Sequence, residues 1–328
     1  MKAALVTEYG GPDALRMADV PVPEPGPGQV AIDVAYAGVN YAEVMARRGA
    51  LPAFAPPFVP GLEVSGTVRA LGEGVEGLRV GQAVGALTTR GGYAEVALAP
   101  AAVTYPLGAD GEADLVVGAA LPTIVPTAWA LVHDVARVRA GEDVLVHAAA
   151  GGVGTVVGQI ARRAGAGRVL GVVGTAAKAA FAERFGYDEV LVGERWDEQA
   201  RAATRGRGLD VVLDSIGGTV RERSFELLAP LGRIVFYGNA CDEPEVGFPG
   251  SRLRAEVKST LGFSITALAA AAPERARALA ERALAAVARG QLEVPITDVL
   301  PLEQAQQAHR LLEGRMTTGK LVLEIAPR

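Results

Sequence analysis

Residues 144–154 read VLVHAAAGGVG. A short apolar run with β-branched residues ends in three alanines, and three closely spaced glycines follow. A helical pattern, TVVGQIARRAG, begins at once at Thr155. Residues without side chains between a strand and a helix indicate either a tight turn or a place where a ligand comes very close to the backbone.

This spacing is typical of the first turn of a dinucleotide-binding βαβ unit, which carries G-x-G-x-x-G. Its glycines permit a tight turn and let a pyrophosphate approach the amides at the start of the helix. Here the match is Ala149-x-Gly151-x-x-Gly154, with Gly152 as an additional glycine. The glycines alone are also compatible with a plain tight turn. Their position after a strand and before a helix favours the dinucleotide.

The pattern around this turn predicts the fold class. From about residue 125, strand-like and helix-like segments alternate, and the strand-like segments are apolar with little alternation, so we expect a parallel sheet covered on both faces. Before it, short strands such as QVAIDVAYAG (29–38) are separated by glycines, which indicates a barrel-like β domain. A long helix over 273–290 and a last strand, GKLVLEIAP, follow.

Composition and charge exclude several classes. Half of the 328 residues are apolar, so the chain can bury a core. The net charge of −5 argues against a nucleic-acid partner, which would need a basic surplus. One cysteine, Cys241, allows no internal disulfide, and no stretch predicts a signal peptide or a membrane span. We therefore expect a cytoplasmic protein.

The end of the next strand indicates which dinucleotide would bind. Sites for NAD usually place an acid there to hold the ribose 2′-hydroxyl. The segment RVLGVVG (168–174) ends without one: Gly174 and Thr175 stand at this point, and Lys178 follows in the first helical turn. A missing carboxylate and a nearby cation favour the 2′-phosphate of NADPH. The alternative for Lys178 is a solvated helix residue.

The whole chain resembles the medium-chain dehydrogenase/reductase superfamily, in its zinc-independent quinone oxidoreductase branch. The resemblance implies an α/β protein with two domains, a GroES-like β-rich substrate domain of residues 1–124 and 266–328, and a Rossmann NADPH-binding domain of residues 125–265. It rests on GVNYAEVMARRG, PGLEVSGTV, VGQAVGAL, PTAW, HAAAGGVG, DVVLDSIGG, LGRIVFYG and TTGKLVL, in the order of the family.

The resemblance also implies chemistry without a metal. Zinc-dependent relatives have Cys and His ligands in the segments that match GVNYAE and PGLEVSG, where this chain has Asn40 and Leu62. One cysteine and three scattered histidines are too few for a zinc site of either kind.

The resemblance assigns site residues as well. It places Asn40 by the nicotinamide ribose and Thr127 near the carboxamide, and it assigns the pyrophosphate to the glycine turn and the 2′-phosphate to Lys178. The candidate catalytic residues are Tyr41 and Asn40. The full set expected to bind the cofactor is Asn40, Thr127, Gly151, Gly152, Val153, Gly154, Gly174, Thr175, Lys178, Tyr237, Gly238, Asn239, Phe263 and Arg315.

Three positions depart from the family pattern. Gly193 stands where many relatives have a Tyr that helps to hold the 2′-phosphate, and Met45 and Leu51 stand where relatives with a quinone pocket have tyrosines. Tyr41 matches a candidate proton donor in the enoyl reductase modules of polyketide synthases. An aromatic side chain that only packs beside the cofactor is the alternative for Tyr41.

The sequence therefore predicts an NADPH-dependent, metal-free reductase that transfers hydride to a quinone. An enoyl or 2-alkenal (enone) reductase is one alternative, and a non-catalytic nucleotide-binding protein like a crystallin is another. The family analogy further predicts a homodimer. The apolar segment EVKSTLGFSI (256–265) is the candidate edge strand for pairing.

Overall fold

A computed structural model describes residues 1–108, 114–241 and 243–325. The chain forms two compact units. Unit 1 comprises Met1–Thr123, Ile265–Ala285 and Val294–Arg328, and unit 2 comprises Ile124–Ser264 and Ala286–Glu293. The predicted limits of the two domains, residues 1–124 with 266–328 and residues 125–265, stay a prediction.

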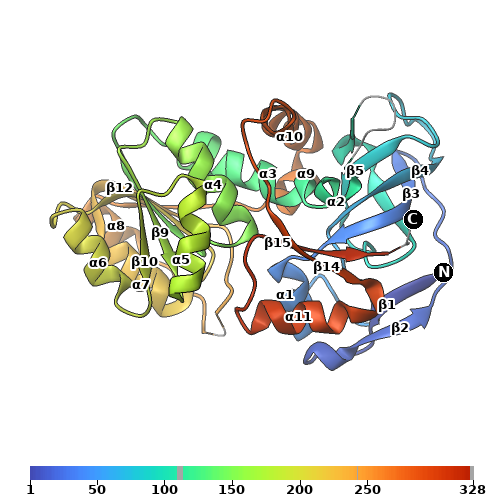
Figure 1. Cartoon of the computed structure of the whole chain (residues 1–328), viewed down its shortest axis with the longest axis horizontal. Coiled ribbons are helices and arrows are strands. Elements are labelled where there is room, and N and C mark those ends of the chain that lie inside the picture. The colour runs from blue at the N-terminus through green and yellow to red at the C-terminus, as the bar shows by residue number, and fades with distance from the viewer. Residues whose placement is uncertain (109–113, 242, 326–328) are drawn as a thin grey trace. The chain divides into compact units, whose positions relative to one another are not determined.

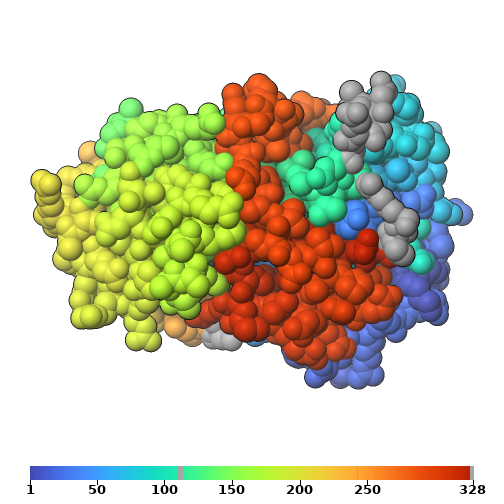
Figure 2. All heavy atoms as spheres, viewed as in Figure 1, coloured from blue at the N-terminus to red at the C-terminus, as the bar shows by residue number. Residues whose placement is uncertain are grey.

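Unit 1 is built on a seven-stranded sheet in the order β14-β15-β3-β4-β5-β7, with β6 paired to β3, and on the separate β1–β2 pair. Figure 1 shows α11 beside α1 and the β1–β2 pair, and Figure 2 shows orange and red atoms of the later part of the chain on the face in view. Its main elements are β1 (Lys2–Val6), β2 (Leu15–Asp19), β3 (Gln29–Gly38), α1 (Tyr41–Arg48), β4 (Glu63–Leu71), β5 (Ala83–Leu87), β6 (Val96–Pro100), β7 (Thr104–Pro106), α2 (Leu115–Gly118), α9 (Ile265–Ala271), β14 (Ile296–Pro301), α11 (Ala305–Glu313) and β15 (Lys320–Glu324), while α3 (Leu121–Trp129) and α10 (Pro273–Ala288) run across the unit limits.

The long strand β3 organises the core of unit 1. Its alternating residues Val30, Ile32 and Val34 are each at most 2% exposed, as the sequence pattern predicts. The strand pairs in antiparallel register with both β4 and β6, and Ile32 lies opposite Val68. The backbone of β3 is thus paired on both sides, and its apolar side chains pack in the core of unit 1.

Unit 2 contains a six-stranded parallel sheet in the order β10-β9-β8-β11-β12-β13. The strand order reverses between β8 and β11, so the predicted doubly wound sheet is confirmed. Figure 1 shows helices on both faces of this sheet. The elements are the π-helical turn Ala130–Val135, β8 (Asp143–His147), α4 (Gly152–Arg163), β9 (Arg168–Val173), α5 (Ala176–Ala182), β10 (Glu189–Val192), α6 (Trp196–Ala203), β11 (Leu209–Asp214), α7 (Gly218–Glu226), β12 (Leu228–Phe236), α8 (Gly250–Glu256) and β13 (Ser259–Gly262).

The predicted edge segment forms β13, which pairs in parallel with β12 and ends the sheet. A homodimer joined through this edge stays a prediction. None of the helices within the described residues is both long and apolar enough to cross a bilayer.

Candidate functional site

The glycine turn follows the carboxyl end of β8. The Gly151 N–H donates to the Ala148 carbonyl at 2.9 Å, and α4 begins at the next residue. A Cβ at Gly154 would lie 2.4 Å from that same carbonyl oxygen and 2.8 Å from the Ala149 Cα. Such contacts do not occur between real atoms, so the close packing of α4 on the turn requires glycine at 154.

The start of α4 fits the phosphates of a dinucleotide. Gly151 is the N-cap residue, and no side chain caps the first turn of this helix. The first N–H groups of a helix have no acceptor within the helix, and they carry the positive end of its dipole. Gly152, Val153 and Gly154 therefore place backbone N–H groups at the positive end of α4, and their assignment to the pyrophosphate stays a prediction.

The neighbouring strand end has no acid. β9 pairs with β8, so Gly174 and Thr175 lie at the same edge of the sheet as the glycine turn. A Cβ at Gly174 would meet nothing within 4 Å, so the turn faces open space. The Thr175 hydroxyl caps α5 by accepting from the Lys178 N–H at 3.4 Å. These features fit a 2′-phosphate better than a ribose 2′-hydroxyl that needs a carboxylate partner.

The same edge also carries the predicted nicotinamide segment. Tyr237, Gly238 and Asn239 follow β12, and the Phe263 N–H, directly after β13, donates to Phe236 at 3.0 Å. Because parallel strands end at one edge, the structure brings these residues to the edge that carries the glycine turn. Among the other predicted residues, Thr127 belongs to unit 2, and Asn40, Tyr41 and Arg315 belong to unit 1.

Asn40 is held by a polar network inside unit 1. Its Nδ2 lies 3.1 Å from Glu63 Oε1 and 3.3 Å from Glu43 Oε1, and its Oδ1 accepts from Lys320 Nζ at 2.6 Å. Its backbone N–H donates to Glu43 at 2.9 Å, which caps the start of α1. Both amide hydrogens of Asn40 are therefore engaged within the network.

A buried ion pair, Lys320–Glu63, lies at the centre of this network. The side chains of Lys320 and Glu63 are 3% and 0% exposed. The second carboxylate oxygen of Glu63 accepts from the Thr123 N–H at 2.9 Å. Both residues lie in segments that carry the family resemblance, PGLEVSGTV and TTGKLVL, yet the sequence alone indicates no role for either residue. A charged residue at the first position of an apolar strand was the available signal.

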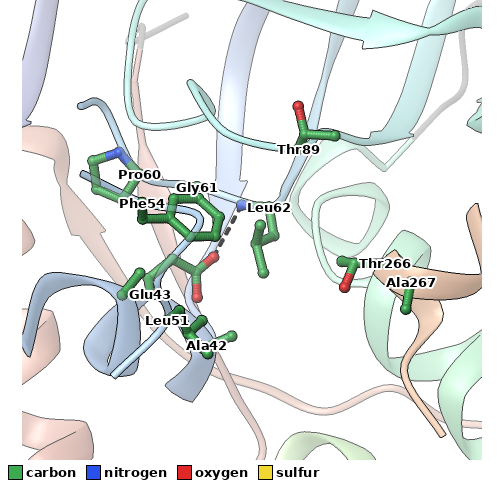
Figure 3. Close-up of a pocket in the computed structure, with 11 residues that line it drawn as sticks. Ala42, Glu43, Leu51, Phe54, Pro60, Gly61, Leu62, Thr89, Thr266 and Ala267 are labelled. Carbon is green, nitrogen blue, oxygen red and sulfur yellow. Dashed lines mark hydrogen bonds between the residues drawn. The ribbon is translucent and has the colours of Figure 1, made fainter. Parts of the chain in front are cut away.

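A pocket of about 300 Å³ lies next to the network. Figure 3 shows the Glu43 carboxyl group facing this pocket, with a hydrogen bond of 3.0 Å from the Leu62 N–H. The lining is mostly apolar and includes Leu51, one of the departures from the family pattern; Tyr41 is adjacent in α1 and is not part of it. The lining residues are Ala42, Glu43, Ala46, Leu51, Phe54, Pro60, Gly61, Leu62, Thr89, Thr266 and Ala267.

Burial raises the pKa of Glu43 from its ordinary 4.5 to about 7, although Lys320 and the hydrogen-bond donors act in the opposite direction. The folded state therefore binds a proton more tightly than the unfolded state. The stabilisation from this proton is complete below pH 4.5 and is lost as the pH rises to 7. A shift of this size corresponds to about 3 kcal/mol.

We predict that Glu43→Gln flattens the pH dependence of unfolding. Gln keeps an acceptor for the cap but does not titrate, so the fall in stability between pH 4.5 and 7 should shrink. Urea unfolding of wild type and variant at several pH values between 4.5 and 7 measures this change in the free energy of unfolding. Glu76→Gln, at an exposed residue of the same unit, is the control. Parallel curves for wild type and Glu43→Gln would contradict the prediction.

The sequence matches two family models. Residues 26–109 match the alcohol dehydrogenase GroES-like domain, and residues 185–323 match the zinc-binding dehydrogenase family. The GroES-like part of the predicted fold is thereby confirmed. Although the second model is named for zinc, Asn40 and Leu62 stand at the predicted ligand positions, and the described residues contain no cluster of three or more His, Cys, Asp or Glu that could hold a metal.

Several curated proteins are similar to the chain. It is 33% identical to 2-haloacrylate reductase of a Burkholderia species and 34% identical to quinone oxidoreductase of Mus musculus, covering 98% of this chain and 98% and 97% of those proteins. It is 35% identical to phthioceranic/hydroxyphthioceranic acid synthase of Mycobacterium tuberculosis over 92% of this chain, but it spans only 14% of that protein's length.

Two solved structures with NADPH are similar as well. The mycobacterial protein Rv1454c in complex with NADPH has a TM-score of 0.92 and 34% identity, and quinone oxidoreductase of Escherichia coli in complex with NADPH has a TM-score of 0.91 and 27% identity. Each likeness covers 99% of this chain and 100% of the other.

Proposed function

Because the chain belongs to the quinone oxidoreductase branch of the medium-chain dehydrogenase/reductase superfamily, we propose that it is an NADPH-dependent, metal-free reductase of quinones. The observation that carries the proposal is the end of β9, which has no acid, next to the start of α4, which no side chain caps; both lie at the carboxyl edge of neighbouring strands. The NADPH-bound solved structures support the choice of cofactor.

The residues of unit 2 would bind and orient the cofactor. NADPH, when bound, supplies a hydride. The amides at the start of α4 would hold the pyrophosphate, and Lys178 would bind the 2′-phosphate as a point charge. Thr127, the segment from Tyr237 to Asn239, Phe263 and, from unit 1, Asn40 and Arg315 stay assigned to the cofactor by the family resemblance.

The pocket of unit 1 is the proposed binding site for the acceptor. Leu51, Phe54 and Leu62 supply apolar surface, and apolar walls exclude water from a reacting group. The single carboxyl group on the wall, that of Glu43, accepts hydrogen bonds from N–H groups of the protein. The mostly apolar lining therefore supports a neutral, apolar substrate such as a quinone.

An enone reductase is the second candidate function. Tyr41 favours it, because addition of hydride to an enone leaves an enolate that needs a proton donor nearby. The similarity to 2-haloacrylate reductase supports it too. Steady-state oxidation of NADPH with a panel of quinones and enones separates the candidates. If no acceptor supports turnover while NADPH still binds, the non-catalytic alternative is favoured. The homodimer and a cytoplasmic location remain part of the proposal.

We predict that the wild type binds NADPH at least about tenfold more tightly than NADH, which corresponds to about 1.4 kcal/mol. Lys178→Ala should bring the two affinities together by weakening NADPH alone, because NADH lacks the 2′-phosphate that Lys178 would bind. Titration of both cofactors against both proteins measures the ratio. Arg195→Ala is the control, since this Arg side chain is 82% exposed in the same unit. Equal affinities in the wild type would contradict the prediction.

A further inference from the structure

An arginine is completely buried next to the predicted nicotinamide segment. Arg221 lies in the first half of α7, and its side chain is 1% exposed. A buried guanidinium needs partners for its charge and for its five N–H groups. No sequence motif implies a role for Arg221, so its role is inferred from the residues that it contacts.

The shortest contacts of Arg221 come from two neighbouring strand ends, and its Nη1 also lies 3.5 Å from the Val246 carbonyl oxygen and 3.6 Å from the Glu245 carboxylate. Its Nε donates to Asp214, the last residue of β11, at 2.7 Å. Its Nη2 donates to the Gly238 carbonyl, just after β12, at 2.8 Å. The guanidinium carbon also lies 4.1 Å from the ring centroid of Phe236. One rigid, planar group therefore joins the end of β11 to the loop that follows β12.

We call the contacts of Arg221 with Asp214 and Gly238 the clamp, and Asp214 extends it to the loop after β11. Its other oxygen accepts the N–H groups of Ile216 and Gly217 at 2.8 and 3.2 Å. Asp214 is 0% exposed, so all of these bonds form away from water, where they are strongest.

The two loops held by the clamp are in direct contact. Ala240 and Cys241 donate their N–H groups to Ser215 and Ile216 at 3.1 and 2.9 Å. A Cβ at Gly217 would lie 1.8 Å from Asn239 Oδ1, so the Asn239 amide rests directly on the Gly217 backbone. A shift of the loop after β12 would therefore move Asn239.

We propose that Arg221 is a positioning residue that fixes the loop from Tyr237 to Asn239 for the nicotinamide end of the cofactor. This inference rests on the proposed function. Although β11 pairs with β8, the contacts of Arg221 within the described residues reach Asp214, Gly238 and the segment Glu245–Val246, and none reaches the turns after β8 and β9 that would hold the pyrophosphate and the adenosine end. Its loss should therefore affect one end of the cofactor and spare the other.

The test compares two ligands on each protein. NADPH carries the nicotinamide end, and adenosine 2′,5′-bisphosphate carries only the adenosine end. Arg221→Met should weaken NADPH about tenfold, in line with the loss of a charge-assisted hydrogen bond, and leave the bisphosphate affinity within about twofold. Turnover should fall through kcat as well as KM, because a misplaced loop misaligns the reacting end. Arg221→Lys keeps the positive charge beside Asp214 but lacks the planar guanidinium that bonds Asp214 and Gly238 together, so it should not restore NADPH affinity.

Two further variants keep the test decisive. Arg223→Met, on the same helix, removes a half-exposed arginine that pairs with Asp197, and it should leave the ratio of the two affinities unchanged. If Arg221→Met does not fold because Asp214 is left as a buried charge, the double variant Asp214→Asn, Arg221→Met removes both charges and should show the same selective loss.

The outcomes separate the inference from the function on which it rests. Unchanged NADPH affinity in a folded Arg221 variant, an equal loss for both ligands, or full recovery with Arg221→Lys would each overturn the positioning role. A wild type that binds neither NADPH nor the bisphosphate would instead overturn the proposed function.

Discussion

Replacing Lys320 with Met is expected to lower the free energy of unfolding by about 3–5 kcal/mol, the usual cost of removing one partner of a buried ion pair. The variant leaves the Glu63 carboxylate fully buried, with N–H donors from Asn40 and Thr123 but no cation. Asn40 Oδ1 also loses the hydrogen bond that it accepts from Lys320. Urea or thermal unfolding followed by circular dichroism measures the loss.

The chain offers two controls for the Lys320 prediction. Lys2→Met breaks the ion pair with Asp19 in the same unit, but those side chains are 59% and 74% exposed, so stability should barely change. The double variant Glu63→Gln, Lys320→Met removes both buried charges and should recover much of the loss, because Gln still accepts the Thr123 N–H. Equal effects of the two single lysine variants, or no recovery in the double variant, would contradict the role assigned to the pair.

The parallel sheet was predictable because its strands are buried on both faces and read as apolar runs. Val144, Leu145 and Val146 of β8 are all 0% exposed. Their burial can be predicted from the apolar run itself, without knowing which strands lie beside it. β14 (Ile296–Pro301) was missed, because most of its residues are exposed and it shows no apolar alternation. Its place at the end of the sheet depends on pairing with β15, which local sequence does not encode.

The glycine turn and the acid-free strand end could be predicted because each lies within one short segment. The Asn40 network could not, because its members come from distant parts of the chain. Glu63 is 257 residues from Lys320, and only the pairing of β3 with both β4 and β15 brings them together. The clamp at Arg221 was missed for a similar reason, since a charged residue in a helix usually reads as solvated.

Tyr41→Phe is expected to reduce kcat about 10²–10³-fold with an enone if Tyr41 is the proton donor, because an enolate depends on a placed donor. Tyr41 is the first residue of α1 and is half-buried. The change removes only the hydroxyl group, so packing should be retained. With a quinone the effect should be small, because charge spreads over a conjugated ring that water protonates. The measurement is kcat for one enone and one quinone, wild type against variant.

The pattern of the two losses then decides what Tyr41 does and which substrate class the site is built for. Tyr9→Phe, at a 46%-exposed tyrosine of the same unit, controls for the general loss of a phenol group. A large drop on the enone alone would favour enone reduction over quinone reduction as the proposed reaction. If neither substrate is affected, Tyr41 is a packing residue, and the proton comes from water or from the cofactor ribose.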